Sequence, residues 1–63
     1  MIDPQKARDL RESKGMSTRE LARMAGISTE TVYAIEHGKR QPSVTTLEKL
    51  ANALGVEARD LFA

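Results

Sequence analysis

The residues from Ser17 to Glu36 constrain the fold more than any other part of the chain. Ser17 is followed three residues later by Glu20, a spacing at which the two side chains cap the start of a helix reciprocally. Apolar residues then recur at helical spacing until Gly26, which can adopt a left-handed conformation at low cost and end the helix. Ser28 is placed to cap a second helix. The stretch therefore predicts two short helices joined by a tight turn.

The second of these helices, expected from about Thr29 to His37, has two unlike faces. At about 100° per residue, Val32 and Ile35 point to one side and form a narrow apolar seam. The opposite side carries short or planar side chains of mixed chemistry, which is unusual for a merely solvated surface and suits the reading of base edges in a DNA major groove. The residues of this outer face are Glu30, Tyr33, Ala34 and His37, with Thr29 and Glu36 on its flank.

Four segments between Leu10 and Phe62 together resemble a known family. They are LRESKGMS, ELARMAGIS, V-x-x-IE-x-GKRQPS and LEKLANALGV-x-x-x-DLF, in this order. The run is similar to the helix-turn-helix repressors and Cro proteins of the phage lambda and phage 434 type, the XRE family. The resemblance implies an all-α fold of five short helices around one core, as a single domain over residues 1–63. It also implies sequence-specific binding of double-stranded DNA, mostly for transcriptional repression.

In this family phosphate contacts set the register of the protein on DNA, and the recognition helix reads bases. Many relatives carry Gln at the first position of the first motif helix, where it contacts a phosphate, and this sequence has Thr18 there. Two cations directly follow the recognition helix and are placed to meet a phosphate strand. The base-reading residues expected are Thr29, Glu30, Tyr33 and Ala34, and the phosphate-contacting residues are Thr18, Arg19, His37, Lys39 and Arg40.

Several of these positions have a second interpretation. In the family an Arg at the position of Arg11 pairs with a Glu at the position of Glu36, although both could be unrelated surface charges. Arg23 is as consistent with a solvated face as with a backbone contact. His37 could cap the end of its helix instead of meeting the DNA backbone.

Glu30 also has two interpretations. An acid in the first turn of a helix is favoured by the helix dipole. Near a polyanion, however, a carboxylate needs a partner, and the exocyclic amine of cytosine is the natural one. Arg19 or a neighbouring hydroxyl could serve instead.

The remaining segments complete the helical pattern. Asp3 and Pro4 start a helix that runs to about Lys14, with Ala7, Leu10 and Arg11 inward. Ser43 caps a fourth helix from Val44 to about Leu54, and a last short turn covers about Ala58 to Phe62. The fourth helix is expected to turn Val44, Leu47, Leu50, Ala51 and Leu54 inward, while Met16 and Met24 fill the core or its edge, and Leu61 and Phe62 cover the core or face a second copy.

Composition excludes several classes of protein. Hydrophobic residues make up 40% of the chain but aromatic residues only 3%, so the core must be aliphatic. With a single His and no Cys, no metal cluster, cofactor or Cys/His nucleophile pair is expected, nor a small-molecule ligand, and we predict no enzyme. No apolar run approaches the roughly 20 residues of a membrane span, and no signal peptide is visible. The expected location is the cytoplasm.

The distribution of charge along the chain bears on the partners that it could bind. The net charge is +1, but residues 1–42 hold eight Lys and Arg against six Asp and Glu, whereas residues 43–63 hold two against three. The basic excess lies in the first two thirds of the chain, which carry the motif. We expect a monomer in solution and a weak or DNA-assisted homodimer on half-sites about one helical turn apart. The alternative is a protein-interaction module, such as the helix-turn-helix part of an antitoxin, or a fragment of a longer regulator.

Overall fold

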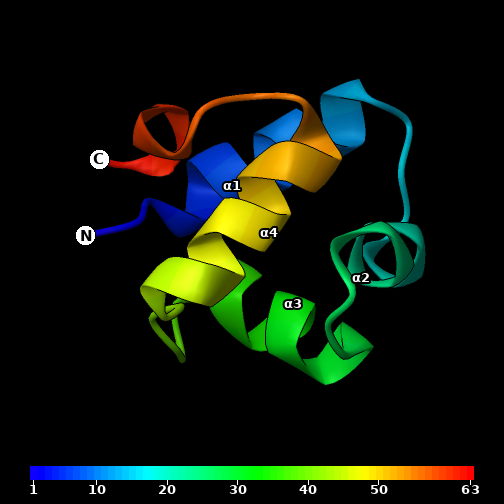
Figure 1. The fold of residues 1–63 in the computed structure, drawn as a ribbon, viewed down its shortest axis with the longest axis horizontal. Coiled ribbons are helices and arrows are strands. Elements are labelled where there is room, and N and C mark those ends of the chain that lie inside the picture. The colour runs from blue at the N-terminus through cyan, green and yellow to red at the C-terminus, as the bar shows by residue number, and fades with distance from the viewer.

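The computed structural model describes all 63 residues and folds them into four α-helices and one 3-10 helix (Figure 1). Each helix begins and ends within one residue of the position predicted from the sequence, and the predicted all-α class is confirmed. The last of the five predicted helices is a single 3-10 turn and not an α-helix. The elements are α1 (Pro4–Ser13), α2 (Thr18–Ala25), α3 (Thr29–Glu36), α4 (Val44–Leu54) and η1 (Ala58–Leu61).

The start of every α-helix is fixed by a polar side chain that accepts a hydrogen bond from a backbone N–H of the first turn. These capping residues are Asp3, Ser17, Ser28 and Ser43. At α2 the cap is reciprocal, because the Ser17 N–H also donates to the Glu20 carboxylate at 2.9 Å. The hydrogen bonds from Ser17 hold the pKa of Glu20 below its ordinary value. At the other end of α2, Gly26 adopts φ +73°, so the tight turn before α3 is determined locally.

The core is aliphatic, as the composition predicts, and it draws on every helix. Val32 and Ile35 are fully buried and confirm the inner face expected for α3. Glu36 is the one charged residue among the buried set, with 2% of its surface exposed. The apolar core consists of Ile2, Ala7, Leu21, Ala22, Ala25, Val32, Ile35, Leu47, Leu50, Ala51, Leu54 and Leu61.

Two residues expected inside are exposed. Val44 is 73% exposed, because it is the first residue of α4 and its side chain leans back beyond the helix start, away from the core. Met24 is 61% exposed, because it lies about 60° around the helix axis from Leu21, on the side away from Ala25, and so falls outside the buried arc of α2. Met16 does pack against the core, as expected.

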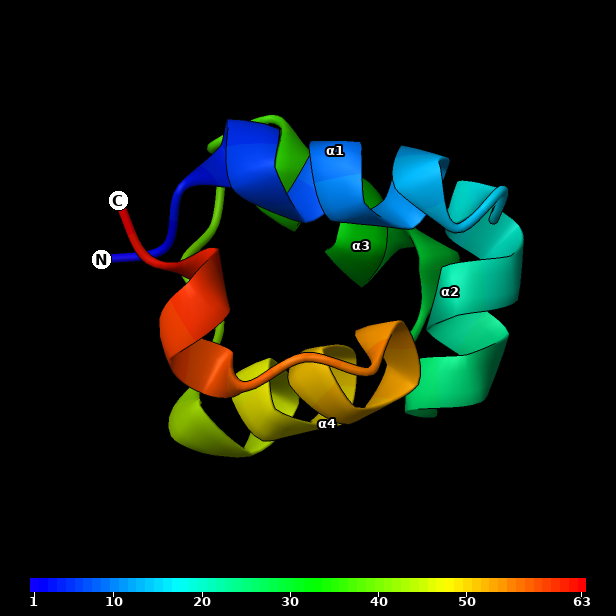
Figure 2. The same ribbon diagram turned by 90° about the horizontal axis from the view of Figure 1, so that it is seen from above.

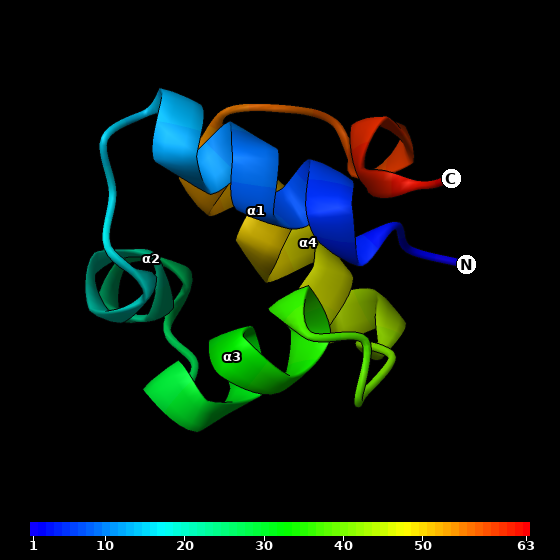
Figure 3. The same ribbon diagram turned by 180° about the vertical axis from the view of Figure 1, so that it is seen from behind.

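The two ends of the chain lie side by side (Figures 1 and 3). Ile2 and Phe62 form an antiparallel bridge, and the Lys6 ammonium donates to the Phe62 carbonyl oxygen at 2.8 Å. Ile2 is buried, although it was not among the core residues predicted from the sequence. Ile2 comes directly before the capping Asp3 and five residues before the buried Ala7, which is the spacing of a hydrophobic staple. This spacing could have indicated its burial. Leu61 is fully buried, and Phe62 remains 37% exposed at the edge.

The arrangement leaves one side of α3 uncovered. Figure 2 shows α1, α2, α4 and η1 around the core, and α3 closes it from one side. Contacts with α1 and α2 hold the inner face of α3. Figure 3 shows α2 beside the start of α3, the loop of residues 37–43 at its other end, and no element over the remaining side. The exposed side of α3 is thus flanked by these two segments.

Candidate nucleic-acid interface

The uncovered side of α3 carries the residues that the sequence predicts to read bases. Thr29 and Glu30 are exposed in the first turn, and Tyr33 is 51% exposed one turn later. Ala34 is partly buried. A short helix that keeps Thr29, Glu30 and Tyr33 outward, while Val32 anchors it to the core, has the size that a major groove admits.

Unpaired cations lie at both ends of this helix. Arg19 and Arg23 of α2 and Lys39 and Arg40 of the following loop are exposed. None of these four side chains forms an ion pair or a hydrogen bond within the chain; the ion pairs involve only Arg11 and Arg59. The charges of Arg19, Lys39 and Arg40 are free to meet an anion, whereas Arg23 also acts on the Glu20 carboxylate, whose pKa it helps to lower.

An open hollow between α2 and α3 places two of these cations beside the start of α3. Its polar lining consists of Ser17, Arg19, Glu20, Arg23, Ser28 and Thr29. Thr18, the remaining phosphate-contacting residue expected on α2, is partly buried and lies outside this lining. The hollow thus combines guanidinium groups with the hydroxyls of the α3 cap.

Glu30 has no partner within the chain. It forms neither a hydrogen bond nor an ion pair, and Arg19 is not close enough to hold it. Of the neighbouring hydroxyls, those of Ser28 and Thr31 share a hydrogen bond of 2.7 Å with each other, and that of Thr29 forms no hydrogen bond to Glu30. Neither Arg19 nor a neighbouring hydroxyl therefore binds this carboxylate within the chain.

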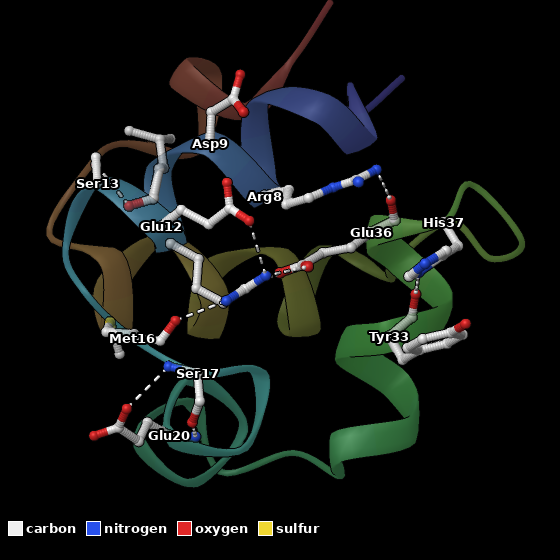
Figure 4. A network of polar contacts seen from close by, with 12 residues as sticks. Arg8, Asp9, Glu12, Ser13, Met16, Ser17, Glu20, Tyr33, Glu36 and His37 are labelled. Carbon is white, nitrogen blue, oxygen red and sulfur yellow. Dashed lines mark hydrogen bonds and ion pairs between the residues drawn. The ribbon is translucent and has the colours of Figure 1, made fainter.

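The structure brings Arg11 and Glu36 together in a two-pronged ion pair. Arg11 Nε and Nη2 donate to the two Glu36 carboxylate oxygens at 2.8 and 3.1 Å, and Nη1 donates to the Met16 carbonyl oxygen at 2.7 Å. In Figure 4 the dashed lines that reach the labelled Glu36, Met16 and Glu12 mark these contacts and the longer approach of Arg11 Nη2 to the Glu12 carboxylate, at 3.9 Å. The hydrogen bonds to Glu36 raise the pKa of Arg11. One side chain thereby joins α1, the segment before α2 and the end of α3.

A second arginine of α1 reaches the same end of α3. Arg8 Nη2 donates to the Glu36 carbonyl oxygen at 3.3 Å, where the partial negative charge of a helix C-terminus favours a cation. Arg8 was not among the residues predicted from the sequence. Arg8 lies three residues before Arg11, so both are on one face of α1. This spacing could have indicated that Arg8 also points toward α3.

His37 and Tyr33 are brought together as well. The His37 ring stacks on the Tyr33 ring, and its Nδ1 lies 2.8 Å from the Tyr33 carbonyl oxygen (Figure 4). From the sequence, the two residues were predicted to have separate roles. Their spacing of four residues, at which side chains on a helix meet, could have indicated the pair.

Other kinds of site have no geometric support. No group of three or more acidic, His or Cys side chains is arranged to hold a metal ion. None of the helices combines the length and apolar character that crossing a membrane requires.

Comparison with known proteins identifies the same motif. A family model described as helix-turn-helix matches residues 8–61. A curated relative, an uncharacterized HTH-type transcriptional regulator of Sinorhizobium fredii, is 40% identical over 52 residues, which cover 82% of this chain and 68% of that protein. The regulator DdrOP3 of Deinococcus deserti is 33% identical over 58 residues, and the match spans only 45% of its length.

Solved structures agree closely in fold. The restriction-modification controller protein C.AhdI of Aeromonas hydrophila is 41% identical with a TM-score of 0.91, covering 94% of this chain and 89% of that one. SinR, a master regulator of biofilm formation solved in complex with DNA, is 33% identical with a TM-score of 0.90, covering 95% and 100%. The phage P22 c2 repressor domain, at 21% identity and a TM-score of 0.90, shares the fold. The relation to regulators also supports the prediction that the chain is not an enzyme. From residue 8 to residue 61, the chain belongs to the helix-turn-helix family of the XRE type.

Proposed function

We propose that residues 1–63 form a single unit that binds double-stranded DNA sequence-specifically and regulates transcription, with α3 in the major groove. One observation carries this proposal most directly. The uncovered side of α3 lies between free cations, Arg19 near its start and Lys39 and Arg40 after its end. A duplex presents phosphates on both rims of its major groove, so this spacing of charge around a protruding helix matches its form.

The residues divide into two groups in this mechanism. Phosphates are held by Thr18, Arg19, Lys39 and Arg40, which fix register without reading sequence. The ion pair between Arg11 and Glu36 holds the end of α3 against α1, so that the helix enters the groove at one angle. Bases are read by Thr29, Glu30, Tyr33 and Ala34.

Selection of bound sites from a random duplex library tests this proposal. We expect one enriched motif, and affinity for it should fall steeply as salt concentration rises, because phosphate contacts release counterions. Failure to enrich any motif would contradict sequence-specific binding. Binding to a partner protein that persists at high salt, without binding to DNA, would support the protein-interaction module instead.

We further propose that the chain represses transcription from an operator on which two copies assemble weakly. Two-fold symmetric proteins of this motif place their recognition helices about one helical turn, roughly 34 Å, apart. Sedimentation without DNA should give a monomer at micromolar concentration, and a footprint on the selected motif should span two half-sites. A stable dimer in free solution would contradict the first expectation, and protection of a single half-site the second.

Replacing Glu30 by Gln should change base preference at one position. The exposed Glu30 has no partner within the chain, and a carboxylate in the groove accepts a hydrogen bond from the amine of cytosine, whereas an amide pairs with adenine. We expect E30Q to shift the preference from cytosine toward adenine by roughly 1–3 kcal/mol. Affinity for non-specific DNA should rise because a negative charge is removed.

Competition between duplexes that differ at each position measures the effect of E30Q. Thr31→Val serves as a control, since Thr31 lies on the same turn but is partly buried and hydrogen-bonded to Ser28. An equal rise in affinity for every sequence would mean that Glu30 only favours the start of the helix, and that Thr29, Tyr33 and Ala34 carry the specificity.

A further inference from the structure

Tyr33 and His37 form one unit on the uncovered side of α3. Their ring centroids are 3.8 Å apart and the ring planes differ by 21°, the geometry of a stacked pair. Side chains on a helix lean back toward the preceding turn, so the later residue, His37, lies over Tyr33. Figure 4 shows the two rings face to face with the Tyr33 hydroxyl directed away from the helix. This hydroxyl has no partner within the chain and remains available.

The hydrogen bonds of His37 decide which of its ring nitrogens carries a proton. The Tyr33 carbonyl oxygen receives the His37 backbone N–H at 3.0 Å and lies 2.8 Å from Nδ1 of the same residue. A carbonyl oxygen only accepts, so Nδ1 must be the donor. In the neutral ring Nε2 is then an acceptor, and donation from Nε2 to a phosphate oxygen requires the protonated ring. The phosphate contact that the sequence suggested for His37 therefore needs a change of protonation, whereas the stack on Tyr33 is already formed in the free chain.

We propose that His37 is a positioning residue that sets the base preference of Tyr33, an inference that rests on the proposed reading of DNA by α3. An exposed tyrosine otherwise samples several rotamers, and ordering it in a complex has an entropic cost. The stack fixes the Tyr33 ring from one side, and the hydrogen bond to the Tyr33 carbonyl fixes the His37 ring. The hydroxyl and ring edge of Tyr33 thereby meet the groove in one orientation.

Two substitutions at His37 separate this role from a phosphate contact. H37F keeps an aromatic ring that can stack on Tyr33 but removes the nitrogen, whereas H37A removes both. The position that Tyr33 reads is first located as the one at which Y33A relaxes the selected motif. There we expect H37A to reduce discrimination between bases about 3- to 10-fold, the range of an aromatic pair's contribution. H37F should retain most of this discrimination, and neither variant should change the dependence of affinity on salt.

Two results in the DNA measurements would overturn the inference. Unchanged discrimination in H37A would show that Tyr33 does not depend on His37. Equal weakening of all duplexes by H37A and H37F, with a lower salt slope, would make His37 a phosphate contact. Lys39→Ala provides the comparison, because it is expected to lower the salt slope without altering base preference.

A measurement without DNA separates this inference from the proposed function. In the free protein, Y33L should shift the proton resonances of the His37 ring, because the ring current of Tyr33 is lost. Absence of that shift would mean that the stack does not form, and it would overturn this inference alone. If the resonance shift shows that the stack forms but the chain selects no duplex, both the proposed function and the role of His37 in reading DNA are overturned.

Discussion

Replacing Arg11 by Met should lower the free energy of unfolding by about 2–4 kcal/mol, a large share of the roughly 3–9 kcal/mol expected for a chain of this length. The side chain of Glu36 is 2% exposed and that of Arg11 12% exposed. R11M leaves the carboxylate buried without its cation, and it also removes the hydrogen bond to the Met16 carbonyl oxygen. Urea unfolding followed by helical circular dichroism measures the effect.

The reciprocal and double variants separate the charge from the packing. E36L should cost less than R11M, because it fills a buried position with an apolar side chain and leaves a cation that water can partly reach. Combining R11M with E36L should recover most of the loss, since no buried charge remains.

A matched control comes from an exposed ion pair of the same chemistry. Arg59 and Glu57 are 3.2 Å apart, but their side chains are 80% and 72% exposed. R59M should therefore change the free energy of unfolding by no more than about 0.5 kcal/mol. If R11M were as mild as R59M, the pair would be solvated and would not brace α3.

Removing Lys39 and Arg40 together should reduce the salt dependence of DNA binding by about two counterions. Each phosphate contact contributes roughly 0.9 to the slope of log affinity against log salt. When the salt concentration is lowered from 1 M to 0.1 M, the affinity of the parent should therefore rise on the order of 50-fold more than that of the variant. The selected base motif should stay the same, because both side chains follow α3 and are not on its outward face.

A second double variant of equal charge isolates the effect of position. Lys14 lies beside Gly55 at the end of α4, and Arg59 belongs to η1, both on the side of the molecule away from α3 (Figure 1). Lys14→Ala with Arg59→Ala removes the same two charges but should leave the slope nearly unchanged. Equal slopes in the two double variants would mean that net charge, and not the loop after α3, governs binding. A changed motif in the first variant would mean that Lys39 or Arg40 reads bases.

The sequence predicts the helices well because their boundaries are set by neighbouring residues. Ser17, Ser28 and Ser43 cap within their own first turns, and Gly26 turns the chain with its own φ angle. None of these interactions spans more than a few residues, so inspection of a short window suffices.

Features that depend on distant parts of the chain were missed or misplaced. Local spacing could indicate that Ile2 and Arg8 face inward, but not what they meet: Ile2 bridges to Phe62 across nearly the whole chain, and Arg8 contacts Glu36, 28 residues away. Helical periodicity placed Val44 inward, but it cannot show that the core reaches Leu47 and stops short of the first residue of α4. The arrangement of Arg11 and Glu36 was anticipated only through the family resemblance, since no local pattern joins them.

The pairing of the two chain ends has a topological consequence. The Ala63 N–H donates to the Met1 carbonyl oxygen at 3.2 Å, so the path of the backbone nearly closes on itself. A short linker could join the ends into a ring, and new ends could then be opened in an exposed loop without moving any helix. The order in which the helices occur along the chain is therefore separable from the way they are assembled in space.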